Sequence, residues 1–525
     1  MTRARVLCYL TVILILLLTA LLATAFGFIT PDSWKYLHVA QALRQGHGCV
    51  LSGEYFAVFP CGYPMAIALS APSADIGSLL VGSKLVNFLL LSGGFLLLAD
   101  ALRNLPAAAL AVLNPLTLHL YRYTWSENLF LFACCGTLFC VARLARHERG
   151  YGYAVLLALF LLIGCLSRYF FGPFAAVLFL ATWLAFGRRV ALKSLPAFLV
   201  AGAFFFGYYS FNAAVTGYGS GLERIPAPES LAYLSLVFVQ ALAKNALAVA
   251  ASFLVFLALS FRAVRFAGSS GEPADRACLF LLLCGIGYLL VAYGLRVSTQ
   301  FDLFGSRTLG YGVVFVMAAL AGFWLRNREQ DRQPVIGLLA CGLFSILVLH
   351  GSLLPQALQA LRSGTFQAPW AGLADYRLRP ATDARVVFVF GVPSLGPNVV
   401  ADVYLYYGDG VKLLLPGMAP YERRESLPQF LARVQMHADQ RCVLDFTPFP
   451  SRAAFDAALS GSYVVDWNFR KSLLAPEKVY QPSVDPELRD YLLEVFRPAR
   501  LVDCRDLLAP TSTAATERTG AGPGR

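Results

Sequence analysis

Long apolar runs fill the first two thirds of the chain, and they restrict its fold more than any other feature. A membrane-spanning helix needs about 20 mostly apolar residues. About eleven such segments follow one another, at residues 6–28, 76–99, 105–121, 126–144, 152–168, 170–187, 195–215, 245–263, 277–295, 306–325 and 334–354. A helix satisfies its own backbone hydrogen bonds in lipid. We therefore predict a polytopic α-helical membrane protein of about eleven transmembrane helices over residues 1–354.

The composition agrees with this class. Hydrophobic residues make up 58% of the chain and charged residues 14%, whereas soluble domains carry roughly a quarter charged residues. The net charge of +12 lies almost wholly before residue 355. Basic loops of a membrane protein explain this excess, so no nucleic-acid partner is expected.

Basic residues mark one side of the membrane. When the predicted spans are threaded in turn, every connection on one side is basic: Arg3/Arg5, Arg103, Arg143/Arg146/Arg149, Arg188/Arg189/Lys193, Arg262/Arg265/Arg276 and Arg326/Arg328/Arg332. Cytoplasmic loops have this bias. We expect an inner (cytoplasmic) membrane protein with a cytoplasmic N-terminus and an extracytoplasmic C-terminal domain. The first segment is too long for a signal peptide and lacks a clear cleavage site, which predicts a retained helix.

Two outside connections are long, residues 29–75 and Thr216 to about Lys244. The first opens with a helical pattern from Pro31 that ends at Gly46 and Gly48. Its apolar face of Trp34, Leu37, Ala40 and Leu43 is typical of a helix in the membrane interface.

Two cysteine pairs lie outside the predicted spans. Cys49 and Cys61 fall in the first outside loop, and Cys442 and Cys504 in the C-terminal part. On the oxidising side of a membrane each pair is a hypothetical disulfide.

The pattern changes after residue 354. Strand patterns at 385–391, 411–415 and 442–446 alternate with helical ones at 398–407, 427–437 and 452–459. This alternation predicts a small extracytoplasmic α/β domain over residues 355–508. The Thr-, Ala- and Gly-rich residues 509–525 are typical of a disordered tail.

Several chemistries are disfavoured by missing motifs. The sequence has no HExxH and no CxxC, so no metal site is predicted. Gly-x-Ser-x-Gly and Walker-type loops are also missing, which argues against serine hydrolases and ATP-driven pumps.

Charged residues gather instead at the predicted outer face. They are Asp32 after the first span, Lys84 inside the second, Glu127 opening the fourth, and Arg168, Arg296 and Arg307 at outer helix ends. Charges at such depths are functional or paired. Cations suit a phosphate, and a carboxylate suits proton abstraction from a nucleophile.

Each of these residues also has a structural interpretation. Asp32 and Glu127 fit helix caps, and Arg168 and Arg307 fit cations that reach lipid headgroups. Lys84 would then pair with Asp75. Because all of these charged residues lie on the predicted outer side of the membrane, a functional site is favoured.

The same residues carry a family resemblance. The stretch Thr30 to Gly48, with Gly62-Tyr63-Pro64, Ser83-Lys84-Leu85-Val86-Asn87, Ser126-Glu127 and Ser167-Arg168-Tyr169, resembles the GT-C superfamily of membrane glycosyltransferases in order and spacing. It is most similar to the branch of protein O-mannosyltransferases and the lipid A aminoarabinose transferase. The chain departs from that branch in having Ser33 where many relatives have Glu, about eleven spans instead of about thirteen, and Ser306-Arg307-Thr308 where Arg-Tyr-x-x-Pro is common.

The resemblance implies transfer of a sugar from a polyprenyl-phosphate carrier to a hydroxyl of an extracytoplasmic protein, lipid or glycan, with inversion. Asp32 would be the general base, and Glu127 would assist Asp32 or bind an acceptor or a metal. Lys84, Arg168, Arg296 and Arg307, with Tyr36 and Tyr63, would bind the substrates. The need for a divalent cation varies within the superfamily, so no cofactor is assigned.

Other functions remain open on sequence alone. A secondary transporter would show broken helices and midplane polar groups. A non-catalytic assembly factor for envelope glycans would tolerate replacement of Asp32. A polysaccharide polymerase or ligase would use a diphosphate-linked donor.

Overall fold

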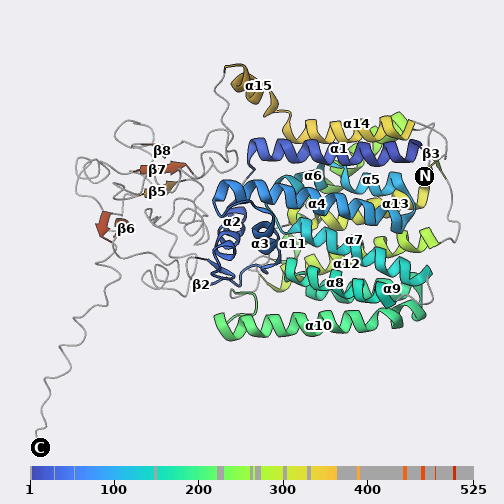
Figure 1. The fold of residues 1–525 in the computed structure, drawn as a ribbon, viewed down its shortest axis with the longest axis horizontal. Helices are drawn as coiled ribbons and strands as arrows, with labels where there is room; N and C mark the ends of the chain where they lie inside the picture. The colour runs from blue at the N-terminus through green and yellow to red at the C-terminus, as the bar shows by residue number, and fades with distance from the viewer. Residues whose placement is uncertain are drawn as a thin grey trace, which may run out of the picture. The chain divides into compact units, whose positions relative to one another are not determined.

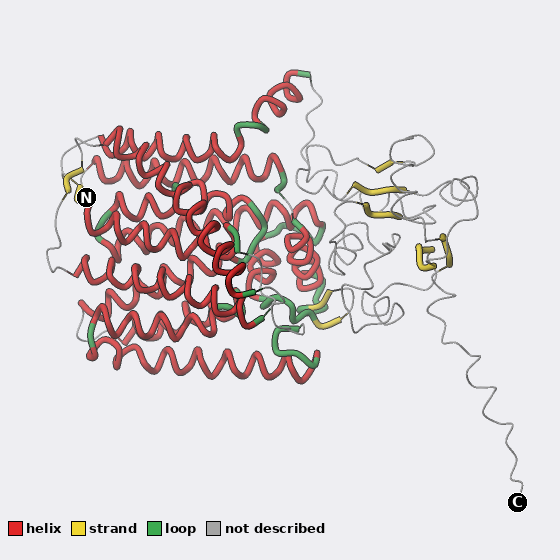
Figure 2. The backbone as a smooth tube through the Cα atoms, turned by 180° about the vertical axis from the view of Figure 1, so that it is seen from behind, coloured by secondary structure: helices red, strands yellow, loops and turns green. Residues whose placement is uncertain are grey.

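The first 363 residues form a bundle of α-helices (Figures 1 and 2). The structure, a computed structural model, describes residues 3–363 except 29, 52–53, 147–150, 222–229, 261–263, 267–272, 300–303 and 328–332, and after residue 363 only five short strands. The longer helices are α1 (Arg3–Phe26), α4 (Ile76–Leu102), α7 (Glu127–Arg146), α8 (Tyr151–Ser167), α9 (Phe171–Phe186), α10 (Arg188–Thr216), α11 (Leu231–Ser260), α12 (Pro273–Ser298), α13 (Ser306–Trp324) and α14 (Gln333–His350). Short helices are α2 (Pro31–Arg44), α3 (Gly62–Ser70), α5 (Leu105–Val112), α6 (Pro115–Arg122) and α15 (Leu354–Arg362).

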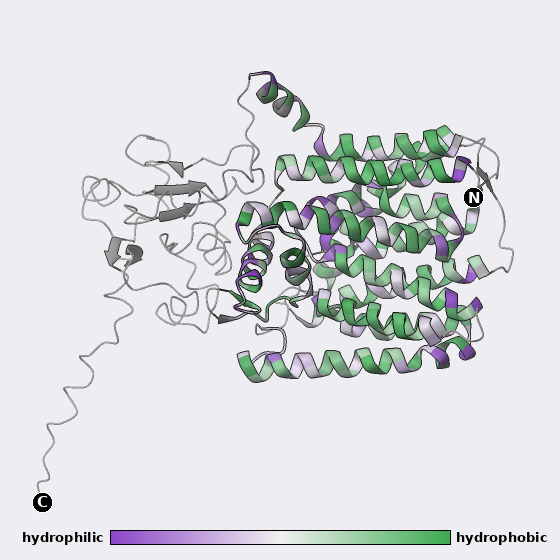
Figure 3. Cartoon of the chain, in the orientation of Figure 1, coloured by the Kyte–Doolittle hydropathy of each residue, from purple (hydrophilic) through white to green (hydrophobic). Residues whose placement is uncertain are grey.

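Among the described residues, 7 helices are long and apolar enough to cross a membrane, namely α1, α4, α7, α10, α11, α12 and α13. Helices α8, α9 and α14 are shorter and apolar. The helices are hydrophobic along their length, with hydrophilic residues concentrated toward their ends (Figure 3). The chain is therefore a multi-pass helical membrane protein, as predicted, while the count of about eleven spans stays a prediction.

The predicted span 105–121 is wrong as a single helix. The chain forms α5 and α6 there, separated by Leu113 and Asn114. Asn114 caps α6 by accepting a hydrogen bond from the Thr117 backbone N–H at 2.9 Å, and Pro115 occupies the first helical turn. Proline cannot continue a preceding helix but suits the start of a new one. All eight residues of α5 are buried, so this segment belongs to the protein core.

Two helices begin earlier than predicted. Helix α11 begins at Leu231 rather than 245, and α10 begins at Arg188 rather than 195. The outside connection predicted from Thr216 to about Lys244 is therefore shorter than the sequence indicated, because Lys244 lies within α11. Polar residues near helix ends lower the local hydropathy without interrupting the helix.

The first outside loop is folded. Helix α2 starts at Pro31 as predicted, and Gly46 and Gly48 follow it with φ of 82° each. Strands β1 (Val50–Leu51) and β2 (Glu54–Tyr55) pair antiparallel, and α3 follows. The end of α2 is tied to the last turn of α3 and to the segment after it, because Arg44 donates to the carbonyls of Ala68 at 2.9 Å and Pro72 at 3.0 Å.

An ion pair joins α4 and α7 near their C-terminal ends. Arg143 of α7 pairs with Asp100 of α4 at 2.7 Å. Strands β3 (Val264–Phe266) and β4 (Leu325–Asn327) pair antiparallel. The Asn104 side chain caps α5 and donates to the Leu325 carbonyl at 2.7 Å.

Beyond residue 363 the described elements are strands. They are β5 (Val387–Phe390), β6 (Arg441–Asp445), β7 (Tyr463–Asp466), β8 (Val479–Tyr480) and β9 (Arg500–Asp503). The predicted strands at 385–391 and 442–446 are thereby confirmed. Strands β5 and β7 are parallel, and β6 and β9 are antiparallel. The predicted strand 411–415, the three predicted helices and the tail 509–525 lie outside the described residues, so the α/β domain stays a prediction.

The chain divides into two compact units. One comprises residues 1–25, 39–74 and 78–367, and the other comprises residues 26–38, 75–77 and 368–525. The start of α2, with Asp32, belongs to the second unit.

Candidate functional site

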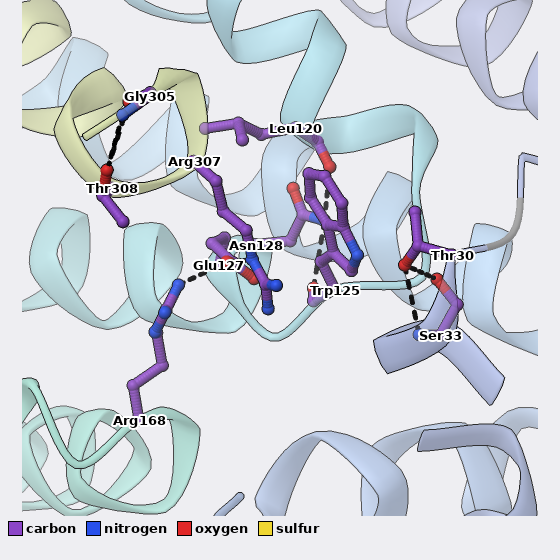
Figure 4. Close-up of polar contacts among 10 residues, drawn as sticks. All are labelled: Thr30, Ser33, Leu120, Trp125, Glu127, Asn128, Arg168, Gly305, Arg307 and Thr308. Carbon is purple, nitrogen blue, oxygen red and sulfur yellow. Dashed lines mark hydrogen bonds and ion pairs between the residues drawn. The ribbon is translucent and has the colours of Figure 1, made fainter. Parts of the chain in front are cut away.

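A buried carboxylate forms the centre of the site in the first unit. Glu127 is the first residue of α7, and its side chain is 1% exposed. Its Oε1 accepts hydrogen bonds from Arg168 Nη1 and from Arg307 Nε (Figure 4). An unpaired charge buried to this extent costs several kcal/mol, so the two guanidinium groups compensate its burial.

Three helix ends bring these charges together. Arg168 lies in the short turn between α8 and α9, and Arg307 lies in the first turn of α13. The Arg307 guanidinium also lies 4.7 Å above the ring of Trp125, which stacks on Tyr123 with ring centroids 4.4 Å apart. The arginines therefore approach Glu127 from two different elements, and Arg307 is held by an aromatic face as well.

The second carboxylate oxygen is not used within the described part of the chain. Glu127 Oε2 is buried and has no hydrogen-bond partner there, and the same holds for Asn128 Oδ1 and the Tyr311 hydroxyl. Buried polar atoms are normally paired. The site thus offers polar atoms to a bound hydroxyl or water.

Aromatic rings lie below the charges. Phe130, one turn after Glu127, stacks on Tyr311 at 6.3 Å and meets Tyr288 edge-on at 5.7 Å. Phe170 and Phe174 contact Phe130 at 5.9 and 5.5 Å. An apolar floor of this kind keeps water away and strengthens the electrostatic interactions above it.

The structure directs Lys84 toward the chain segment before Glu127. Lys84 is 2% exposed, and its Nζ donates to the Arg122 carbonyl at 2.8 Å and to Thr124 Oγ1 at 3.2 Å. Asn87, one turn later, donates to the carbonyls of Tyr121 at 2.9 Å and Tyr123 at 2.7 Å. These contacts anchor residues 121–124, which lead into Glu127.

Tyr63 belongs to the same anchor. It is fully buried in α3, and its hydroxyl donates to Asn87 Oδ1 at 2.7 Å. Asn87 belongs to the sequence motif Ser83-Lys84-Leu85-Val86-Asn87. Only the fold shows that its side chain contacts Tyr121 and Tyr123, which lie 34 and 36 residues later in the sequence.

Three further predicted residues are Arg296, Asp32 and Tyr36. Arg296 lies buried in the last turn of α12, and neither ion pair that Glu127 forms with described residues includes it. In the second unit, Asp32 lies in the first turn of α2 with its side chain 21% exposed, 4.0 Å from Lys35 Nζ. Tyr36 lies one turn later and is buried.

Asp32 is not needed as the cap of α2. The Ser33 backbone N–H donates to Thr30 Oγ1 at 3.3 Å, and the two hydroxyls of these residues lie 2.9 Å apart. Thr30 therefore fills the capping position that precedes Pro31. The helix-cap interpretation of Asp32 is thus not supported, and its functional role stays a prediction.

Among the described residues, no cluster of possible metal ligands is found. Within the part of the chain that the structure describes, no group of three or more His, Cys, Asp and Glu side chains comes together. Arginines surround the one buried carboxylate of the site, and like charges disfavour a cation beside them.

The fold is similar to folds found among solved structures. One of these is ArnT from Cupriavidus metallidurans in the apo state, with a TM-score of 0.51 over 95% of this chain and 98% of that one, at 10% identity. The predicted resemblance to the GT-C superfamily is thus confirmed at the level of the fold.

Two other solved structures are similar to a lesser degree. ArnT from Cupriavidus metallidurans bound to undecaprenyl phosphate has a TM-score of 0.48 at 12% identity, over 95% of this chain and 98% of that chain. The Archaeoglobus fulgidus oligosaccharyltransferase has a TM-score of 0.37 at 11% identity, over 82% of this chain and 69% of that chain. No family model and no curated protein matches the sequence.

Proposed function

We propose that the protein is an inverting membrane glycosyltransferase. It would move a sugar from a polyprenyl-phosphate carrier to a hydroxyl of an extracytoplasmic protein, lipid or glycan. It would act in the inner membrane, with its N-terminus in the cytoplasm. The ArnT-like fold supports this class, as does the order of the outer-face motifs.

The observation that carries the proposal is the charge cluster at Glu127. Two arginines from separate helix ends converge on one buried carboxylate over an aromatic floor. A guanidinium has five N–H donors in a planar fork, and Glu127 binds one nitrogen of each arginine. Such cations suit the leaving phosphate of a lipid carrier, where negative charge increases in the transition state.

In the proposed reaction the acceptor hydroxyl attacks the anomeric carbon in one step. A bond forms between the acceptor oxygen and this carbon as the bond from the carbon to the phosphate oxygen breaks. The Asp32 carboxylate takes the hydroxyl proton, and the polyprenyl phosphate leaves with its electron pair. Attack opposite the leaving group inverts the anomeric centre.

Other residues have supporting roles in the proposal. Arg307 and Arg168 stabilise the phosphate, with Arg296 and Lys84 as further cations, and Glu127 orients the arginines and receives a hydroxyl at Oε2. Tyr36 and Tyr63 contribute to the substrate site. No cofactor is invoked.

Replacement of Asp32 by Asn tests the proposal. Mass spectrometry of envelope glycoproteins and glycolipids should show that one defined sugar is lost, with the variant inserted at normal levels. Removal of a general base typically costs 10²–10⁴-fold in rate. The matched control is Asp100→Asn. This variant removes a different carboxylate, which lies near the C-terminal end of α4 and pairs with Arg143.

Three outcomes contradict the proposal. If full deletion changes the glycan profile and Asp32→Asn leaves it unchanged, Asp32 is excluded as the base. A deletion that changes no glycan would favour a transporter or an assembly factor. A diphosphate lipid product would indicate a polymerase or ligase instead.

A further inference from the structure

A second polar cluster lies beside the site, around Asn212 of α10. Asn212 is fully buried, and its Oδ1 accepts a hydrogen bond from the Tyr55 hydroxyl at 2.7 Å. Its Nδ2 donates to the Tyr169 hydroxyl at 2.8 Å and to the Gly219 carbonyl at 3.2 Å. One amide thus joins three segments: the β1–β2 hairpin, the turn between α8 and α9, and the loop after α10.

The segment that follows the hairpin, residues 56–62, contacts the chain on both sides of Arg168. On one side, the Tyr169 hydroxyl donates to the Ala57 carbonyl at 2.6 Å. On the other, Gly62 at the start of α3 packs so closely that a Cβ added there would lie 2.7 Å from both Cβ and the carbonyl oxygen of Leu166. Any side chain at position 62 would therefore push the start of α3 and the end of α8 apart.

A disulfide closes the hairpin between these two contacts. Cys49 and Cys61 are bonded, and Ala57 lies within the loop that the bond closes. Gly62 directly follows Cys61. The Phe56 backbone N–H donates to the Cys49 carbonyl at 3.0 Å, which adds a hydrogen bond across the loop.

The loop after α10 supports the same hairpin. Gly221 has a φ of 71°, and a Cβ there would lie 2.5 Å from the Ala57 carbonyl carbon and 2.7 Å from the Val58 nitrogen. This close approach needs glycine for both its conformation and its size. Burial raises the pKa of both Tyr55 and Tyr169, so their hydroxyls stay protonated and available as donors.

We infer that Asn212, Tyr169 and the disulfide-closed hairpin are positioning elements for Arg168. They hold the residues before and after Arg168, while the ion pair with Glu127 holds the Arg168 side chain itself. Arg168 lies between the two sets of contacts, so its guanidinium direction depends on both. The role in turnover rests on the proposed function, whereas the coupling to Glu127 does not.

A double-mutant cycle on the purified full-length protein tests the coupling. Tyr169→Phe removes one hydroxyl and keeps the ring. Glu127→Gln removes the carboxylate that pairs with Arg168. We expect Tyr169→Phe to lower the Tm in detergent clearly in the wild-type background and by less than half as much in the Glu127→Gln background. Residues in one network are non-additive in this way.

Two further variants sharpen the cycle. Asn212→Asp keeps the acceptor for Tyr55 and loses both N–H donors, so it should couple to Glu127→Gln as Tyr169→Phe does. Tyr209→Phe is the matched control, because the Tyr209 ring lies 6.2 Å from that of Tyr169, and no hydrogen bond joins its hydroxyl to a described residue. Its effect should be small and additive.

The outcomes separate this inference from the proposed function. Additive Tm shifts for Tyr169→Phe and Asn212→Asp would overturn it, whatever the activity. Coupled shifts in a protein that transfers no sugar would uphold it and overturn the proposed function. With transfer established, we expect Tyr169→Phe to lower kcat on the order of tenfold with KM nearly unchanged, since Arg168 would act on the leaving phosphate.

Discussion

Glu127 and Arg307 lie 180 residues apart in the sequence, and their side chains form an ion pair between the first turns of α7 and α13. Arg168, which lies 41 residues after Glu127, shares the same carboxylate oxygen. A single buried acceptor thus links three elements of the bundle. The three residues are therefore unequal, because Glu127 takes part in both of these ion pairs and each arginine takes part in one of them.

Glu127→Gln should destabilise the protein more than Arg307→Gln does. Removing the carboxylate breaks both ion pairs at once, at a cost of about 3–5 kcal/mol. Removing Arg307 leaves Glu127 paired with Arg168, at a cost of about 1.5–3 kcal/mol for one charged hydrogen bond. Thermal unfolding in detergent gives the order of the two variants. A larger loss for Arg307→Gln would show that its stacking on Trp125 matters more than the shared ion pair.

Lys84→Met should lower stability through the segment before Glu127. The change leaves the Arg122 carbonyl without its ammonium donor, at a cost of about 1–3 kcal/mol. Lys244→Met is the control, since Lys244 is exposed on α11.

The same variant tests the predicted substrate-binding role of Lys84. Binding of farnesyl phosphate, a short polyprenyl phosphate, can be measured by native mass spectrometry. A lower Tm with unchanged binding would identify Lys84 as an anchor of residues 121–124. Weaker binding at an unchanged Tm would support the substrate-binding role instead.

The helices could be predicted from hydropathy because most of them are apolar throughout. Hydropathy does not show where one helix ends and another begins. Residues 105–121 are mostly apolar, although the helix breaks at Asn114-Pro115. The Asn-Pro pair was the signal that would have found it. The start of α11 was missed because a helix can continue past residues such as Gln240 and Lys244.

The site was partly predictable for a different reason. Glu127, Arg168 and Arg307 stand out as charges at helix ends, and the fold does bring them together. Asn212 and Asn87 carry no charge, and nothing in the sequence shows that they reach residues far along the chain. Their roles depend on tertiary contacts, which spacing and composition do not encode.

Alkylation should distinguish the hairpin cysteines from the buried ones. In protein denatured without reductant, Cys49 and Cys61 should stay unmodified because their thiols are bonded to each other. Cys134 and Cys135 are free and buried in α7, so unfolding exposes them to the reagent at once. Peptide mass spectrometry before and after reduction reads both pairs. Modification of Cys49 before reduction would contradict the disulfide.

Loss of that disulfide should also loosen the hairpin. The bond spans a sequence separation of 12 residues, and closing a loop of about this size stabilises a protein by about 3 kcal/mol. The double variant Cys49→Ser with Cys61→Ser should therefore unfold at a lower temperature than wild type. In the variant, Tyr169→Phe should cost less than it does in wild type, since the hairpin no longer holds the Ala57 carbonyl firmly. An equal cost in both would place the Tyr169 contact outside the influence of the disulfide.

Single cysteines on either side of α11 test the orientation of the bundle. Helix α11 covers residues 231–260 and is long enough to cross the membrane once, so positions 227 and 270 should lie on opposite sides. The basic residues Arg262, Arg265 and Arg276 favour the cytoplasm for position 270. In intact cells stripped of the outer barrier, a membrane-impermeant maleimide should label Ala227→Cys and spare Ser270→Cys until the membrane is opened with detergent. Labelling of Ser270→Cys alone would invert the orientation, and with it the predicted side of the membrane for Glu127 and Arg168. Labelling of both without detergent would mean that α11 does not span the membrane, because one crossing cannot leave its two ends on the same side.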